Sequence, residues 1–208
     1  MRRAHGNRCD LGPLRVYLIA AGAMVVFVLS ATQTASQQDR PPTPEDWQKA
    51  ERDIKRVPPS AFKELPMAIV KQLEARGCTI PQAADISEPH NVIRGEFAQS
   101  GQMDWAVLCS KEGKSSILIF WQKPTACSSE LPASEDKFWL QGLGQGRIGY
   151  SRKITAVGKK YVLDHFRTYG GPTPPALDHE GIDDAFVEKA SVVHYCHQGK
   201  WLDLQGAD

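Results

Sequence analysis

The densest group of side chains with chemical potential lies between Asp178 and Asp184. Its members are Asp178, His179, Glu180, Asp183 and Asp184. Carboxylates and an imidazole this close together can bind a metal ion or act as a general acid–base pair. The alternative is a solvated turn in which Asp184 accepts hydrogen bonds from its own backbone amides. We favour the turn and no metal site, and we keep a metal-assisted hydrolase that uses the His179–Asp184 cluster as the rival hypothesis.

Other residues with functional potential are few. Phe138 and Trp139 lie beside a glycine-rich stretch that could form an adaptable binding surface, although we favour a role for both rings in the core. His194 and Cys196 share one face of a predicted strand and His197 points away, which argues against a metal pair there. The sequence has no P-loop, dinucleotide fingerprint, H-E-x-x-H or G-x-S-x-G motif. We therefore predict no cofactor and do not predict an enzyme.

One segment, residues 96–107, carries a recognisable motif, E-F-A-Q-S-G-Q-M-D-W-A-V. It resembles the loop-and-strand core of FG-GAP-type (integrin-alpha and VCBS-type) repeats, in which a D-x-[DN]-x-D-G-x-x-D loop usually binds calcium. The resemblance places Gly101 at the turn glycine, Asp104 at the last acid and Glu96 at the first ligand. Alanine and serine occupy the two middle ligand positions. Because calcium takes six to eight oxygen ligands, we expect weak calcium binding or none.

A fainter copy of this motif follows 80 residues later, where Gly181 and Asp184 correspond to Gly101 and Asp104. Its middle positions hold acids, but Ala176 stands at the first ligand position. The pattern also has a physical interpretation that needs no family. A glycine permits a tight turn, and an aspartate three residues later can accept hydrogen bonds from the free amides of that turn.

The first 35 residues have the pattern of an export signal. Arginines lie ahead of an apolar run from Val16 to Leu29, and small and polar residues follow up to Ala35. This order of charged, apolar and small residues is typical of a secretory signal peptide. The apolar run is shorter than the roughly 20 residues that span a bilayer. We predict a signal peptide over residues 1–35, with cleavage after Ala35.

The predicted cleavage sets the domain boundaries and the compartment. It leaves a linker over 36–43 and a single domain over 44–208, whereas an uncleaved segment over 16–31 would tether that domain to a membrane. Removing the four arginines and one aspartate of the signal changes the net charge from +1 to −2. A near-neutral domain without basic runs argues against binding to nucleic acid or, after cleavage, to membranes. We predict a secreted or periplasmic protein with an unknown extracytoplasmic partner.

Helices are predicted near the start of the domain and strands beyond it. Thr43-Pro44-Glu45-Asp46 is a typical helix start, and Pro58-Pro59 ends that helix. A second helix is predicted over 60–76, with a break or a restart at Pro66. Three hairpins follow, which pair 104–110 with 115–121, 148–155 with 161–168, and 191–196 with 200–204. The fold class is therefore α+β, with N-terminal helices packed on a mainly antiparallel β-sheet of about six strands.

Four cysteines remain after the predicted cleavage, and an even number in an exported protein predicts two disulfides. These are Cys78, Cys109, Cys127 and Cys196. The first hairpin puts Cys109 near its turn and Cys127 beyond its open end, roughly 16 Å away at about 3.3 Å per residue. A disulfide needs Cα atoms within about 7 Å, so Cys109–Cys127 and its complement are excluded. Of the other two pairings we prefer Cys78–Cys109 with Cys127–Cys196, because Cys78 follows the helix that must cover the hairpin.

The function predicted from these features is an exported small globular protein that acts as a non-catalytic binding or interaction module.

Overall fold

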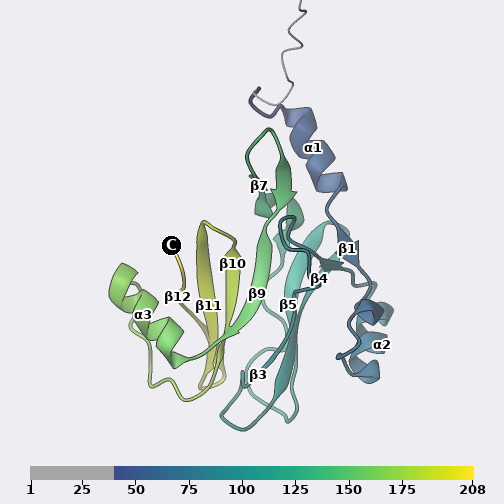
Figure 1. Cartoon of the computed structure of the whole chain (residues 1–208). Coiled ribbons are helices and arrows are strands. Elements are labelled where there is room, and N and C mark those ends of the chain that lie inside the picture. Colours follow the sequence, from purple (N-terminus) through teal and green to yellow (C-terminus); the bar gives the residue numbers. More distant parts are fainter. Residues whose placement is uncertain (1–39) are drawn as a thin grey trace, which may run out of the picture. The chain divides into compact units, whose positions relative to one another are not determined.

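The computed structural model describes residues 40–208 (Figure 1). The predicted signal peptide and cleavage site, and the first half of the predicted linker, lie outside these residues. Within the described part of the chain, no helix is long and apolar enough to cross a membrane.

The first of two four-stranded sheets is antiparallel and runs in the order β3-β4-β5-β6. Its strands are β3 (Val92–Gly95), β4 (Asp104–Lys111), β5 (Lys114–Phe120) and β6 (Ser134–Glu135). Glu112 and Gly113 form the β4–β5 turn with φ of 51° and 77°, which is the left-handed conformation of a tight hairpin. Ser110 lies opposite Ser115 as predicted, so the first predicted hairpin is confirmed.

The second four-stranded sheet is also antiparallel, in the order β12-β11-β10-β9. Its strands are β9 (Arg152–Val157), β10 (Gly181–Phe186), β11 (Ala190–His197) and β12 (Lys200–Gln205). Gln198 and Gly199 repeat the left-handed turn, with φ of 49° and 77°. The third predicted hairpin is therefore confirmed.

The two sheets pack face to face, and each outer face carries a helix (Figure 1). The shared core holds Ala106, Leu108, Ile117 and Ile119 from the first sheet and Ile154 and Ile182 from the second. On the outer face of the first sheet, α2 (Met67–Ala75) buries Leu73 against Val107. On the outer face of the second, α3 (Lys159–Tyr169) buries Val162 against Val193. Apolar residues on both sides of the strands thus give a four-layer arrangement.

Smaller elements lie beside these layers, where some join the core under α2 and others form a separate cluster around Tyr150. They are α1 (Pro44–Arg52), β1 (Arg56–Val57), η2 (Pro59–Ala61), β2 (Ile80–Pro81), η3 (Asp136–Trp139), β7 (Leu140–Gly142) and β8 (Ile148–Tyr150). α1 begins as predicted, because the Thr43 hydroxyl accepts from the Asp46 amide and the Asp46 carboxylate accepts from the Thr43 amide. Its residue Ala50 packs with Ile54, Leu140 and Tyr150.

The fold is mixed α and β and mostly strand, but the predicted arrangement of N-terminal helices on one sheet of about six strands is wrong. The described residues form four antiparallel sheets, two with four strands and two with two strands. Of the two N-terminal helices, only α2 covers a large sheet, whereas α1 contacts the β7–β8 hairpin. Both helices are also shorter than predicted, because α1 ends at Arg52 and α2 starts at Met67, after Pro66.

The second predicted hairpin is also wrong, because 161–168 lies in α3 instead of a strand. Alternation of Tyr161, Leu163 and His165 resembles strand periodicity. However, the residues between Gly158 and Gly170 form an 11-residue helix. On this helix the rings of Tyr161 and His165 contact each other, as side chains at the i, i+4 spacing do.

Two disulfides link the layers, and they are the two pairs preferred from the sequence. Cys78–Cys109 joins the end of α2 to β4, with Cα atoms 5.2 Å apart. Cys127–Cys196 fastens the loop after β5 to β11, with Cα atoms 6.1 Å apart. Disulfides persist in oxidising compartments.

Candidate functional site

The side chains predicted as a cluster between Asp178 and Asp184 do not converge. His179 stacks on Tyr195 with ring centroids 4.2 Å apart, and its ring nitrogens contact two backbone carbonyls. Asp178 accepts from the Tyr195 hydroxyl, and Glu180 accepts from the backbone amide of Glu96 at 2.8 Å. Across residues 40–208, no three histidine, cysteine or acidic side chains are placed to hold a metal ion.

Asp183 and Asp184 point to opposite faces of β10, because successive strand residues alternate. Asp184 faces the first sheet and forms a two-bond ion pair with Arg152, at 2.8 and 2.7 Å. Both side chains are buried. The expectation that Asp184 caps its own backbone is therefore wrong, since a buried guanidinium takes both of its oxygens.

Arg152 also connects the two large sheets. Its Nη1 donates to the Ser115 hydroxyl and carbonyl at 2.9 and 3.1 Å. The ring of Trp139 lies over the guanidinium, 4.3 Å from its centroid to Cζ. Trp139, a weak candidate for ligand binding, thus contacts the buried arginine, whereas its neighbour Phe138 is 66% exposed.

His194 extends this charged cluster to the edge of the second sheet. Its ring lies 3.7 Å from Asp184 Oδ2 and 2.7 Å from Asp203 Oδ1. Burial would lower the pKa of His194, but the carboxylates of Asp184 and Asp203 raise it above its ordinary value. Burial would raise the pKa of Asp184, but hydrogen bonds from Arg152 and His194 hold it below its usual range.

A second buried ion pair lies at the turn end of the first sheet. Arg56 donates to Asp136 Oδ2 at 2.6 Å, and the Ser110 hydroxyl donates to the same oxygen at 2.6 Å. Ser110 lies opposite Ser115 across strands β4 and β5. The Arg56–Asp136 ion pair contacts the first of these serines, and the Arg152–Asp184 ion pair contacts the second. Because the charges neutralise one another inside the protein, we assign both ion pairs a structural role.

Asp183 differs from its neighbour because no cationic side chain among residues 40–208 pairs with it. It is buried on the α3 side of β10, where its Oδ1 atom lacks a hydrogen-bond partner. Burial raises the pKa of Asp183 above its ordinary value. Ionisation of Asp183 therefore lowers stability as the pH rises from its unfolded-state pKa through the higher folded-state pKa.

We expect Asp183→Asn to raise the free energy of unfolding at pH 7 by on the order of 1 kcal/mol, because it removes a buried unpaired charge. Urea unfolding at pH 7 and pH 3.5 measures this, and the gain should shrink at the lower pH. Asp53→Asn, at an exposed ion pair with Lys49, should change little at either pH. A loss of stability in Asp183→Asn at pH 7 would contradict the assignment.

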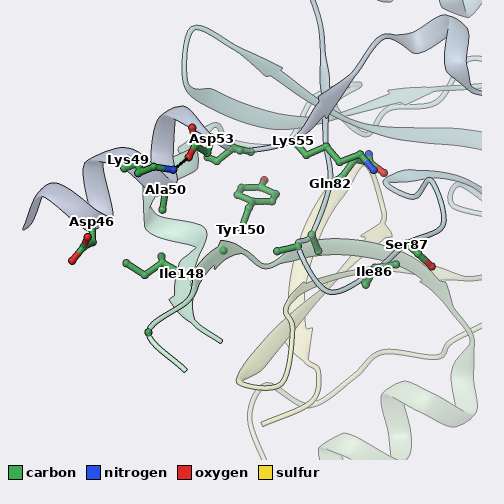
Figure 2. Close-up of a pocket in the computed structure, with 15 residues that line it drawn as sticks. Asp46, Lys49, Ala50, Asp53, Lys55, Gln82, Ile86, Ser87, Ile148 and Tyr150 are labelled. Carbon is green, nitrogen blue, oxygen red and sulfur yellow. Dashed lines mark hydrogen bonds and ion pairs between the residues drawn. The ribbon is translucent and has the colours of Figure 1, made fainter. Parts of the chain in front are cut away.

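A pocket of about 480 Å³ lies among α1, the segment from Gln82 to Ser87, and β8 (Figure 2). Its apolar floor includes Ile54, Ile148 and Tyr150. The charged side chains that α1 adds to its rim are already paired, since Lys49 bonds Asp53 and Asp46 bonds Arg40. This rim offers no nucleophile beside a base.

A second hollow, of about 530 Å³, lies where α2 meets the open end of the β4–β5 hairpin. We call it the aromatic groove. Its lining consists of Ile69, Gln72, Arg76, Arg94, Met103, Trp105, Leu118, Ile119, Phe120, Trp121, Gln122 and Ser129. Among these residues the only charged side chains are the two arginines. Trp105, Phe120, Trp121 and Met103 all keep part of their surface exposed.

The two arginines of the aromatic groove differ in their partners. The guanidinium of Arg94 lies 5.8 Å from the ring centroid of Trp105 and forms no ion pair with any residue from 40 to 208. Arg76 lies 3.5 Å from Glu130, and both of those side chains are more than half exposed. The groove thus combines partly exposed aromatic rings with the positive charge of Arg94.

No family model, curated protein or solved structure matches the chain.

The loop that resembles an FG-GAP-type repeat behaves as the turn chemistry predicts. Gly101 has φ of 79°, and Asp104 accepts from the Ala98 amide at 3.2 Å and the Gln122 amide at 2.8 Å. The second copy differs, because Gly181 is the first residue of β10 and forms no turn. The two segments share a sequence pattern but not a local structure.

The aromatic groove was not predicted from the sequence. Trp105 and Phe120 lie in strands whose two faces are both apolar, a pattern that predicts burial on both sides. In the structure α2 forms one wall of the groove through Ile69, Gln72 and Arg76 and leaves part of these rings uncovered. Arginine beside tryptophan on an outer strand face was the available signal.

Proposed function

We propose that this chain is an exported, non-catalytic binding module, and that the aromatic groove is the surface that contacts its partner. Tryptophan, phenylalanine, methionine and arginine are enriched at protein interfaces and among the residues that dominate binding energy. The observation that carries the proposal is their concentration in one hollow whose only charges are Arg76 and Arg94. Export is supported by the predicted signal and by the two disulfides.

The partner that fits this groove is an acidic segment with large apolar side chains. Apolar side chains would fill the space over Trp105 and Phe120, and carboxylates would pair with the arginines at the rim. Arg94 is the stronger anchor, since it has no acidic partner to give up. Electrostatic complementarity of this kind favours negative over positive segments. The ancestral link to FG-GAP-type repeats also remains a proposal, based on the loop at Gly101.

Selection of displayed random peptides on the disulfide-bonded protein tests this proposal. We expect the enriched peptides to be net negative and to contain leucine or aromatic residues. Arg94→Glu and Arg76→Glu should each weaken their binding about tenfold or more, because loss of a hot-spot contact typically costs about 2 kcal/mol. Arg52→Glu, an exposed charge reversal on α1, is the matched control and should have little effect.

Two results would contradict the proposal. One is enrichment of basic peptides, and the other is binding that Arg94→Glu and Arg52→Glu weaken equally. Binding should also weaken as salt increases, because the rim charges are exposed to solvent.

A further inference from the structure

One wall of the pocket in Figure 2 is a loop to which the ring of a single histidine, His90, is hydrogen-bonded. Ala83, Ala84, Ile86 and Ser87 line the pocket from this side. The loop returns at His90, which is buried. The backbone amide and carbonyl of His90 both bond the side-chain amide of Gln82, at 3.0 and 2.9 Å, and so close the base of the loop.

The hydrogen bonds of the His90 ring determine its protonation state. The backbone amide of Ala83 donates to Nε2 at 2.7 Å, so Nε2 carries no hydrogen. Nδ1 therefore carries the hydrogen of the neutral ring and donates to the Glu88 carbonyl at 2.8 Å. The ring thus braces both ends of the 83–88 segment, but only while it is neutral.

We propose that the segment Ala83–Glu88 is an acid-released wall of this pocket, and that His90 is its latch. A proton on Nε2 would point at the Ala83 amide, so the charged ring cannot keep this hydrogen bond. The wall then has to move away from the ring. The proposal concerns the pocket of Figure 2 and is independent of the aromatic groove.

The surroundings of His90 favour the neutral ring. Burial lowers the pKa of His90 below its ordinary value, and the positive charges of Lys153 on β9 and Lys55 after α1 lower it further. The hydrogen bond to the Glu88 carbonyl acts in the opposite direction. Asp85, an acid of the same loop, pairs with Arg147 at 3.0 Å.

The pH window follows from this direction. Because the pKa in the latched form lies below the ordinary value of 6.5, the released form takes up a proton first as the pH falls. The latched form is fully favoured above about pH 6.5. Below that value the release equilibrium rises by up to about tenfold per pH unit, until the latched ring itself becomes protonated.

We expect release to be local, because the wall segment is held by fewer buried contacts than the base of the loop. The moving part is held by the Ala84 amide, which donates to the Tyr150 carbonyl at 2.8 Å, and by the exposed Asp85–Arg147 pair. The base is held by buried Asn91, which donates to the Pro81 carbonyl at 2.7 Å and accepts from the Ile154 amide at 2.9 Å. Opening should therefore stop at Gln82 and Asn91.

Amide hydrogen exchange of the whole protein between pH 7.5 and 4.5, corrected for the intrinsic rate at each pH, tests the latch. We expect the protection of the Ala83 amide to fall by up to about tenfold per pH unit below about pH 6.5. Val193, in the core of the second sheet, should keep its protection, which separates loop release from global unfolding.

Two variants make the test specific. In His90→Gln the amide oxygen can replace Nε2 as acceptor but does not titrate, so the protection of Ala83 should become independent of pH. In His90→Leu there is no acceptor, so protection should be low throughout. Constant protection of Ala83 in the wild type, or an equal fall in His90→Gln, would overturn the proposal.

Discussion

Replacing Arg152 by methionine should lower the free energy of unfolding by about 3–5 kcal/mol at pH 7. The arginine is 3% exposed in its side chain and neutralises Asp184, which is 7% exposed. Methionine would leave that carboxylate buried without its cation and would remove the hydrogen bonds to Ser115 that join the two sheets. Urea unfolding of the oxidised protein measures the change.

Two further variants separate the buried charge from ordinary packing. Arg167→Met removes an exposed ion pair with Asp164 and should change stability by less than about 0.5 kcal/mol. The double variant Arg152→Met with Asp184→Leu removes both charges, and it should recover much of the loss. If the double variant is as unstable as Arg152→Met alone, the unpaired Asp184 is not the cause.

Removing the Cys127–Cys196 bridge by a double alanine substitution should lower the free energy of unfolding by about 4 kcal/mol. The bridge closes 69 residues of sequence, so its loss frees much of the unfolded chain. The same change at Cys78–Cys109, which closes 31 residues, should have a somewhat smaller effect. Denaturant unfolding of each double variant, beside the wild type with and without reductant, measures both contributions.

The informative result is which of the two disulfide variants loses more unfolding free energy. A much larger loss for the Cys78–Cys109 variant would show that the bridge between α2 and β4 contributes more than its loop length accounts for. No loss for either variant would contradict a role for the disulfides in stability.

Much of the strand pairing could be predicted because its signals are local. Glu112-Gly113 and Gln198-Gly199 are short turns between apolar strands, and both hairpins form there. The register of the first hairpin excluded one of the three disulfide pairings, and the position of Cys78 after the covering helix gave the preference between the other two. The helix α3 was missed because Tyr161, Leu163 and His165 alternate as strand residues do, and the contacts that select the helix come from the second sheet.

The partners of buried polar side chains depend on tertiary contacts that no local pattern reveals. Asp184 appeared to belong to a turn, yet its partner Arg152 lies 32 positions away on another strand. His90 lies in a loop, and only the structure places its ring against the Ala83 amide. The aromatic groove likewise depends on how α2 lies against the sheet.

The central claim, that the aromatic groove binds an acidic segment, is tested most directly by a charge swap. Each acidic residue of the tightest selected peptide is replaced by lysine in turn, and the variants are titrated by calorimetry against the wild type and Arg94→Glu. We expect one position at which lysine weakens binding to the wild type about tenfold and restores binding to Arg94→Glu. If every lysine peptide binds the two proteins with the same relative loss, Arg94 does not contact the ligand, which would contradict binding in the aromatic groove.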